Sequence, residues 1–322
     1  MFILNLYYSN SLIWNHSKQI IAKICSNKTI LDLFSPVVQV RYKQLLIYGK
    51  YHGNNCGRSI GQVNATLKMK EQKNYSGKVT EGAKKRMSKA IDLLLQASPM
   101  QKVYNPILKR YQHFQLTFLT LTIAEDGIML DAKYCYNYLL LPFLRILREK
   151  YNVVNYVWKV ELQERGQIHY HLTLNKFIMF NELQIEWNML QKKLGLLDSF
   201  YQKFQHYEPN GIDIHAVYKV NDIKAYLLKY LKKTEQNQTT INSKIWGCSE
   251  NLRHAKNVEF YLCDIDLKKL QELKEFVDTE IFKNEHCEII TAKSQKITSV
   301  FNSNQLKSIN QNIRNISKKQ TI

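Results

Sequence analysis

The order of apolar and polar positions along the chain predicts both short strands and longer helices. Segments rich in β-branched and aromatic residues predict strands at 113–123 (HFQLTFLTLTI), 153–161 (VVNYVWKVE), 168–174 (IHYHLTL) and 211–217 (GIDIHAV). The connection between the second and third of these, around Arg165 and Gly166, is short. We therefore expect these two strands to pair as an antiparallel hairpin.

Helical spacing of apolar residues predicts four helices, at 81–98, 131–151, 182–195 and 221–233. The first ends before Pro99, and the second contains Pro142, which we expect to kink it. Gly195 closes the third, and the fourth opens with Asn221 and Asp222, which favour helix N-caps.

The strands and helices alternate without the regular rhythm of a parallel barrel, which indicates an α+β fold. We expect a central antiparallel sheet with helices packed on it. The domain division that we expect is a basic N-terminal extension of unassigned role at 1–100, a folded domain at 101–290, and a polar basic tail at 291–322. The tail is rich in Ser, Asn, Gln and Lys and is expected to be disordered.

The charge of the chain points to a polyanionic partner. Its 322 residues contain 46 Lys and Arg against 27 Asp and Glu, a formal charge of +19. Residues 1–100 hold 15 basic and four acidic residues, and residues 291–322 hold six basic residues and no acidic one. Basic residues that neutralise phosphates release counterions, so nucleic acid is the expected partner.

The sequence contains no sign of a membrane or secretory segment. No apolar run reaches the roughly 20 residues that cross a bilayer, and the opening residues do not resemble a secretory signal. The six cysteines have no C-x-x-C spacing, so reduced thiols in the cytoplasm are the simplest expectation.

The hairpin at 161–171 (ELQERGQIHYH) carries the first candidate site. His169 and His171 point to one face of their strand, because side chains alternate. A turn centred on Arg165 places Glu161 opposite His169 and Lys159 opposite His171, so Glu161 shares the histidine face. Such a His, His, Glu set could bind one divalent cation.

Other interpretations of these residues stay open. A His-x-His pair on a strand is often surface decoration without a ligand role. Glu164 is a rival ligand, but it lies at the turn and on the other face of the strand. His215 is an alternative third ligand, although a packed core position is the expectation we favour for it.

The second candidate site lies in the predicted helix at 226–233 (YLLKYLKK). At about 100° per residue, Tyr226, Lys229, Tyr230 and Lys233 fall on one stripe. The leucines at 227, 228 and 231 fall on the opposite side and can bury against a sheet. Tyrosines at this spacing often serve packing alone. Neighbouring cations nevertheless favour phenolate, and phenolate is a nucleophile.

Together these motifs resemble the HUH endonucleases that initiate rolling-circle replication. The resemblance rests on Glu161, on the His169-Tyr170-His171 segment, and on the four residues of the tyrosine stripe. The strand segment FLTLT (118–122) occupies the place of the family's first motif, and WGCSE (246–250) looks like a recurring segment of its phage-type members. The resemblance covers roughly residues 110–250, so the expected domain at 101–290 is an HUH nuclease domain.

The resemblance implies a mechanism and partners. Glu161, His169 and His171 would hold Mg²⁺ or Mn²⁺, and Tyr226 or Tyr230 would attack a phosphate of single-stranded or origin DNA. The products are a 5′-phosphotyrosyl bond and a free 3′-OH, and strand transfer by the second tyrosine then releases a circle. No phosphate-binding loop of a helicase is present, so a host helicase and a host DNA polymerase are the expected partners in a bacterial cytoplasm.

Two alternatives remain at this point. One is an HUH transposase or a mobilisation relaxase with the same chemistry. The other is a non-enzymatic, basic DNA-binding protein whose histidines hold a structural metal and whose tyrosines stack on bases.

Overall fold

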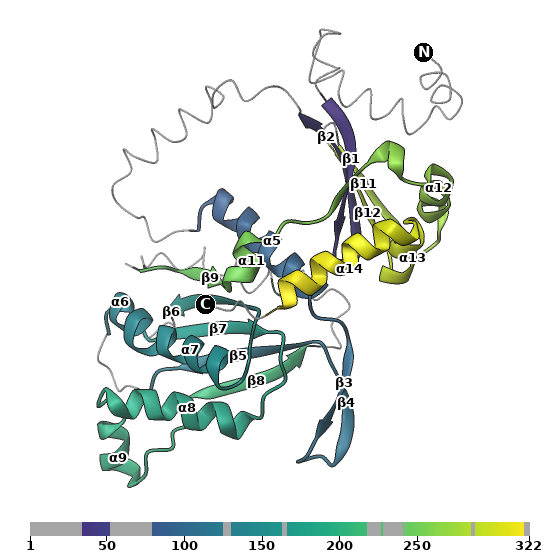
Figure 1. The fold of residues 1–322 in the computed structure, drawn as a ribbon. Coiled ribbons are helices and arrows are strands. Elements are labelled where there is room, and N and C mark those ends of the chain that lie inside the picture. The colour runs from purple at the N-terminus through teal and green to yellow at the C-terminus, as the bar shows by residue number, and fades with distance from the viewer. Residues whose placement is uncertain are drawn as a thin grey trace, which may run out of the picture. The chain divides into compact units, whose positions relative to one another are not determined.

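The computed structural model describes residues 34–51, 79–124, 130–162, 166–217, 227, 241, 243–284 and 287–318. The chain divides into two compact units. The first unit comprises Met1–Glu71 and Lys256–Ile313, and the second comprises Gln72–Ala255 and Arg314–Ile322. Both units combine antiparallel sheets with helices, so the predicted α+β class is confirmed (Figure 1).

A five-stranded antiparallel sheet in the order β8-β5-β7-β6-β9 forms the centre of the second unit. Its strands are β5 (Leu116–Thr122), β6 (Tyr156–Leu162), β7 (Ile168–Leu174), β8 (Ile212–Val217) and β9 (Trp246–Cys248). A separate ribbon consists of β3 (Gln101–Asn105) and β4 (Arg110–Phe114). The predicted hairpin is confirmed, because β6 and β7 pair with Glu161 opposite His169 and Lys159 opposite His171.

The predicted segments 81–98, 131–151 and 182–195 are helical in the structure. The helices of the second unit are α5 (Glu81–Gln96), α6 (Ala132–Cys135), the π-helix η1 (Tyr136–Leu140), α7 (Leu141–Glu149), α8 (Phe180–Lys193), α9 (Asp198–Phe204) and α11 (Glu250–His254). Pro142 stands in the first turn of α7, directly after the π-helical turn. Proline cannot donate the usual backbone hydrogen bond, so the change of helical register falls where the sequence predicted a kink.

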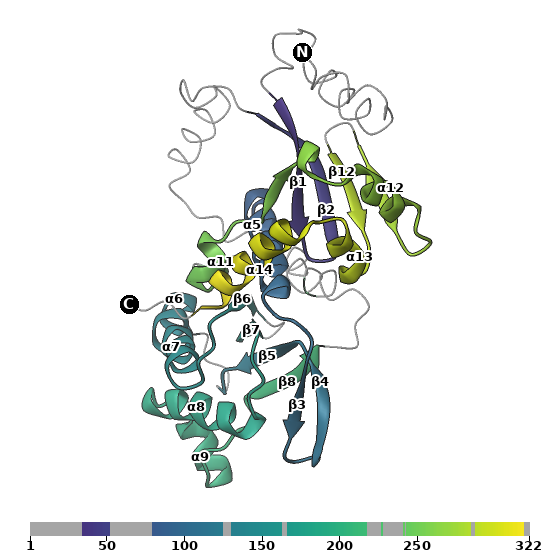
Figure 2. The same ribbon diagram turned by 45° about the vertical axis from the view of Figure 1, so that its right-hand side comes forward.

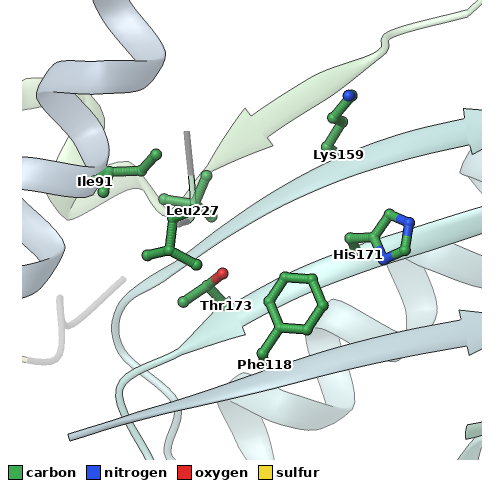
Figure 3. A pocket seen from close by; sticks show the side chains of 7 residues that line it. Ile91, Phe118, Lys159, His171, Thr173 and Leu227 are labelled. Carbon is green, nitrogen blue, oxygen red and sulfur yellow. The ribbon is translucent and has the colours of Figure 1, made fainter. Parts of the chain in front are cut away.

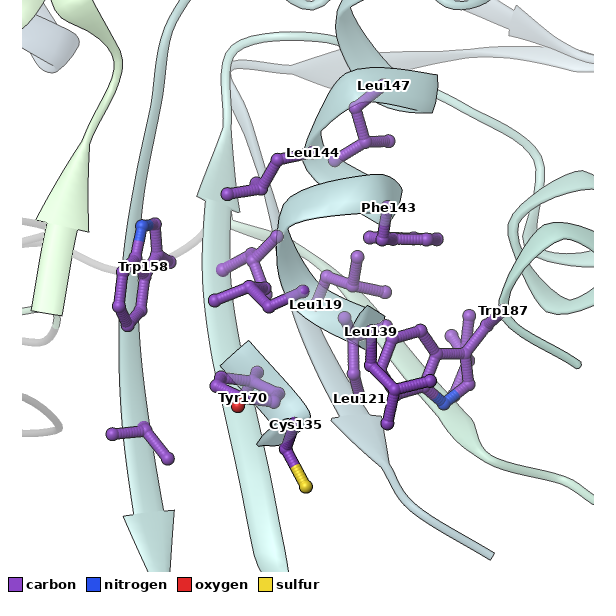
Figure 4. Close-up of a cluster of buried hydrophobic side chains, with 14 of the residues drawn as sticks. Leu119, Leu121, Cys135, Leu139, Phe143, Leu144, Leu147, Trp158, Tyr170 and Trp187 are labelled. Carbon is purple, nitrogen blue, oxygen red and sulfur yellow. The ribbon is translucent and has the colours of Figure 1, made fainter. Parts of the chain in front are cut away.

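One face of the central sheet carries the main hydrophobic core. Tyr170 of β7 lies in this core with Phe143 of α7 and Trp187 of α8 (Figure 4). Leu172 of β7 belongs to the same buried cluster. The Tyr170 hydroxyl is buried and has no hydrogen-bond partner among the described residues. The alternation along β7 therefore divides the strand into a core face and a histidine face.

The first unit is a second five-stranded sheet with helices on one face. Its strand order is β10-β1-β2-β12-β11. The strands are β1 (Phe34–Arg41), β2 (Gln44–Tyr51), β10 (Glu259–Tyr261), β11 (Glu280–Lys283) and β12 (Cys287–Thr291). The helical elements are η3 (Leu262–Asp264), α12 (Leu267–Glu275), α13 (Ser294–Ser299) and α14 (Ser303–Ser317) up to Ile313, since the end of α14 from Arg314 belongs to the second unit. They are drawn in green to yellow in Figures 1 and 2.

A polar cluster on the sheet of the first unit centres on Glu259. Its carboxylate accepts hydrogen bonds from Gln39 Nε2 at 2.9 Å, Tyr48 Oη at 2.7 Å and Lys50 Nζ at 2.7 Å. Burial raises the pKa of Glu259, but these hydrogen bonds outweigh it and leave the pKa below its usual value. Burial and the bond to Glu259 raise the pKa of Tyr48 to about 12.

The structure divides the chain differently from the expected division at 100 and 291. Strands β1 and β2, from the expected extension, share a sheet with β12, whereas α5 belongs to the second unit. The expected disordered tail instead forms α13 and α14, with Ile297, Ile309 and Ile316 buried. These isoleucines lie among Ser, Asn and Gln, so the polar composition concealed an apolar stripe.

None of the helices in the described ranges is long and apolar enough to cross a membrane.

Candidate active site

The candidate site lies on the face of the central sheet opposite the main core. Register places Thr120 of β5, His171 of β7 and Lys159 of β6 in one row across this face. Thr122, His169 and Glu161 form the adjacent row. Side chains directly opposite in paired antiparallel strands share a face, so both predicted histidines and the predicted glutamate lie together.

His171 is held from both sides of its ring. Its Nε2 atom lies 2.8 Å from Glu161 Oε2, and its Nδ1 atom lies 3.1 Å from Thr120 Oγ1. The ring also stacks on Phe118, with centroids 5.7 Å apart and planes inclined by 20°. These contacts fix the orientation of the imidazole, as hydrogen-bonded neighbours do for metal-binding histidines.

His169 lies beside this pair and is buried. Burial, and to a smaller extent the neighbouring His171, lower the pKa of His169 to about 4. The imidazole is therefore neutral at neutral pH, which is the protonation state that can bind a metal.

The separation of Glu161 and His171 fits a shared cation. Two ligands about 2.1 Å from one cation, at a right angle, lie about 3 Å apart, and the observed separation is 2.8 Å. As the side chains stand, however, the described residues contain no group of three His, Cys, Asp or Glu that could hold a metal ion. The geometry thus brings Glu161 and His171 together as candidate ligands, with His169 next to them on the same face.

Lys159 is a site residue to which the sequence analysis assigned no role. The residue is only 1% exposed, although lysine is a residue type that is usually exposed, and it lines a small cavity with His171. The register prediction already placed it opposite His171, but no sequence signal indicated its burial. Thr120 was likewise missed, because its contact with His171 depends on the pairing of β5 with β7.

Leu227 closes the same cavity and connects the site to the predicted tyrosine helix. It is helical and 2% exposed, and Figure 3 shows it over the strands, between Ile91 of α5 and Thr173. The prediction that Leu227 buries against the sheet is confirmed. The predicted catalytic residues Tyr226, Lys229, Tyr230 and Lys233 lie outside the described residues, as does the rival ligand Glu164.

His215 does not occupy the core position that we expected. Its side chain is exposed, and Nε2 lies 2.9 Å from Asp213 Oδ2. His215 lies on β8 and pairs with Phe118 of β5. β8 is an edge strand of this sheet, and among the described residues no further strand pairs with it. Asp213 and His215 alternate with Ile212 and Ile214 along β8, so the strand pattern itself put both polar residues on one face.

The WGCSE segment forms the edge strand β9, the N-cap Ser249 and the first residue of α11. Gly247 lies against the ring of Trp158, where an added Cβ would come within 2.7 Å of Trp158 Nε1. Ser249 Oγ donates a hydrogen bond to Asn155 Oδ1 at 3.3 Å. The segment therefore supports the strand that carries Glu161 and supplies no side chain to the cavity beside His171.

Comparison with known proteins adds one match. Residues 116–235 match a family of replication-associated proteins, described as the ORF2 and gene 2 protein type. No curated protein and no solved structure gives a match to this chain. The matched stretch includes Glu161, His169 and His171 as well as residues 226–233, and the similarity supports a role in the initiation of replication.

Proposed function

We propose that this chain is a DNA nickase and strand-transferase that starts rolling-circle replication. The observation that carries the proposal is the contact of Glu161 with His171 on a sheet face that Leu227 covers. The match to replication-associated proteins spans both parts of this arrangement and supports DNA as the substrate.

In this proposal Glu161, His169 and His171 hold Mg²⁺ or Mn²⁺. When bound, the cation would stabilise negative charge on a phosphodiester oxygen. Mn²⁺ suits a set with two imidazoles at least as well as Mg²⁺, which prefers oxygen ligands. Thr120 keeps the His171 ring oriented, and neutral His169 can offer a nitrogen lone pair.

The nucleophile is the hydroxyl of Tyr226 or Tyr230. Its oxygen forms a bond to phosphorus as the bond from phosphorus to O3′ breaks. The phenol loses its proton, and O3′ gains a proton to become the free 3′-OH. Lys229 and Lys233 favour the phenolate form. After one round of synthesis the second tyrosine cuts the strand again and frees a new 3′-OH. This 3′-OH attacks the phosphorus of the first phosphotyrosyl bond, the first tyrosine leaves, and a circle is closed.

Tyr226 directly precedes Leu227 in the sequence, and Leu227 lines the cavity with His171 and Lys159. We further propose that Lys159, when protonated, offsets phosphate charge beside His171, because the attraction between opposite charges is stronger where water is excluded.

Two other functions use parts of the same site. A transposase or relaxase would share the chemistry and differ in its DNA partner. A non-enzymatic DNA-binding protein would use the histidines for a structural metal. Host helicase and polymerase belong to the replication proposal alone, because the polymerase would extend the free 3′-OH while the helicase separates the strands of the duplex.

The test is the formation of a covalent adduct. The full chain is incubated with Mn²⁺ and single-stranded oligonucleotides that span its replicon, and the products are separated on a denaturing gel. We expect an adduct with the wild type, none with the Tyr226→Phe, Tyr230→Phe double variant, and a large loss with His171→Ala. His254→Ala is the matched control, because His254 is exposed on α11 and paired with Glu250.

Tight DNA binding by the wild type without any adduct would favour the non-enzymatic function. An adduct that persists in the double phenylalanine variant would show that another residue is the nucleophile.

A further inference from the structure

The ribbon of β3 and β4 is a projecting element that the proposed chemistry does not use. Its register pairs Lys102 with His113 and Tyr104 with Tyr111. Figures 1 and 2 both show the ribbon extending beyond the five-stranded sheet of the second unit, with its turn at the far end. All four side chains on one face, Lys102, Tyr104, Tyr111 and His113, are exposed, so core packing does not explain their identities.

One face of the ribbon presents two exposed tyrosines side by side. Tyr104 is 50% exposed and Tyr111 is 70% exposed. Their ring centroids lie 5.4 Å apart, with planes inclined by 63°. Lys102 and His113 form the next pair on this same face, because pairs two residues apart along a ribbon point the same way. The face therefore combines aromatic rings with a cation.

The charge of the ribbon is of one sign. Residues 97–124 contain Lys102, Lys109 and Arg110 but no Asp or Glu. An exposed acidic residue would repel a phosphate backbone, and none is present over this stretch. The charge complements a polyanion, whereas the exposed rings offer stacking surface to unpaired bases.

The ribbon is ordered before any partner binds. Asn105 Oδ1 accepts hydrogen bonds from the backbone N–H groups of Ile107 at 3.0 Å and Leu108 at 3.1 Å, which fixes the turn. Asn105 Nδ2 donates to Gln112 Oε1 across the strands at 3.1 Å. At the base, buried Phe114 packs edge-on against Phe177. A pre-ordered surface loses less conformational entropy on binding.

The ribbon is also connected directly to the site. One residue separates Phe114 at the end of β4 from Leu116 at the start of β5, and β5 carries Thr120 beside His171. Six residues of extended chain span about 20 Å. A DNA strand of several nucleotides could therefore contact both the ribbon and the candidate active site.

We infer that the tyrosine face of the β3–β4 ribbon binds single-stranded DNA next to the nick site, with Tyr104 and Tyr111 stacking on bases and Lys102 contacting phosphate. This inference rests on the proposed function for the identity of its ligand. Duplex DNA or a protein would be a different partner, and the experiment below separates these outcomes.

The test uses the full chain with the Tyr104→Leu, Tyr111→Leu double substitution. Affinity for a fluorescein-labelled oligothymidylate is measured by fluorescence anisotropy. Since stacking contributes about 1–3 kcal/mol per base, we expect Kd to rise about tenfold or more. The matched control is Tyr134→Leu, Tyr138→Leu, which replaces another exposed tyrosine pair in the second unit, 37% and 55% exposed with centroids 4.8 Å apart. It should bind as the wild type does.

Unchanged affinity in the ribbon variant would overturn the inference, and so would an equal loss in the control variant. A loss confined to duplex DNA would also overturn it. Photocrosslinking with 5-iodouracil in the oligonucleotide should map to Tyr104 or Tyr111, and crosslinks found only elsewhere would contradict the assignment. Equal melting temperatures for both variants and the wild type establish that folding is intact.

The two proposals fail in distinguishable ways. If the wild type forms the covalent adduct and the ribbon variant binds normally, the ribbon inference falls and the proposed nickase stands. If the wild type forms no adduct but the ribbon variant loses affinity, the nickase falls and the ribbon remains a DNA-binding surface.

Discussion

The Glu161 carboxylate is hydrogen-bonded to His171, although the backbone partner of Glu161 across the hairpin is His169. Diagonal neighbours in an antiparallel pair lie within reach of long side chains. The contact therefore links the two rows of the site face, and it leaves His169 beside the pair with a neutral ring. This relationship determines which substitutions test the site most sharply.

Glu161→Gln should abolish most of the cleavage while preserving the shape of the site. The amide can still contact His171 Nε2, but it lacks the charge that would hold a divalent cation. We expect a loss of about a hundredfold or more in the rate of adduct formation, measured in single-turnover assays with Mn²⁺. Calorimetric titration with Mn²⁺ should show weaker binding. Cleavage by this variant at the wild-type rate would contradict the proposed role of Glu161 in the site.

Tyr170→Phe should stabilise the protein. The Tyr170 hydroxyl is buried in the main core without a hydrogen-bond partner among the described residues, and such a group costs about 1–3 kcal/mol. Burial also raises the pKa of this tyrosine. We expect the free energy of unfolding in urea to increase by about 1 kcal/mol. A decrease would mean that the hydroxyl has a partner in solution.

Gly247→Ala should destabilise the second unit. The new methyl group would lie 2.7 Å from Trp158 Nε1, and overpacking of this kind costs about 1–3 kcal/mol. Gly82→Ala is the matched control, because the nearest atom to an added Cβ is 3.5 Å away on a flexible arginine side chain. Thermal unfolding should show a lower Tm for the first variant and an unchanged or slightly higher Tm for the control.

Glu259→Gln should destabilise the first unit in a pH-dependent way. The folded-state pKa of Glu259 is depressed, so the folded protein binds this proton more weakly than the unfolded chain does. Its stabilisation is therefore fully present above the unfolded pKa of about 4.3 and is lost as pH falls through the folded pKa.

Urea unfolding of wild type and variant at several pH values checks this expectation. The difference between them should be largest near neutral pH and should shrink in acid. A difference that does not change with pH would mean that the charge of Glu259 contributes nothing to folding.

The sequence by itself determined the local structure around the site. Alternation along β7 separated Tyr170 from His169 and His171, and the short link at Arg165 and Gly166 fixed the register that places Glu161 opposite His169. Both features depend on neighbours within about ten residues, so the period of the pattern and the length of the turn were sufficient. Helix α5 was predictable for the same reason.

The tertiary structure alone decided which distant segments meet. Strand β2 pairs with β12 although Tyr48 and Cys287 are far apart in sequence, and no local pattern encodes such a partner. The burial of Lys159 and the exposure of His215 depend on what covers each part of the sheet, because burial is a property of packing and not of the strand pattern. The contact of Thr120 with the His171 ring likewise arises only when β5 pairs with β7.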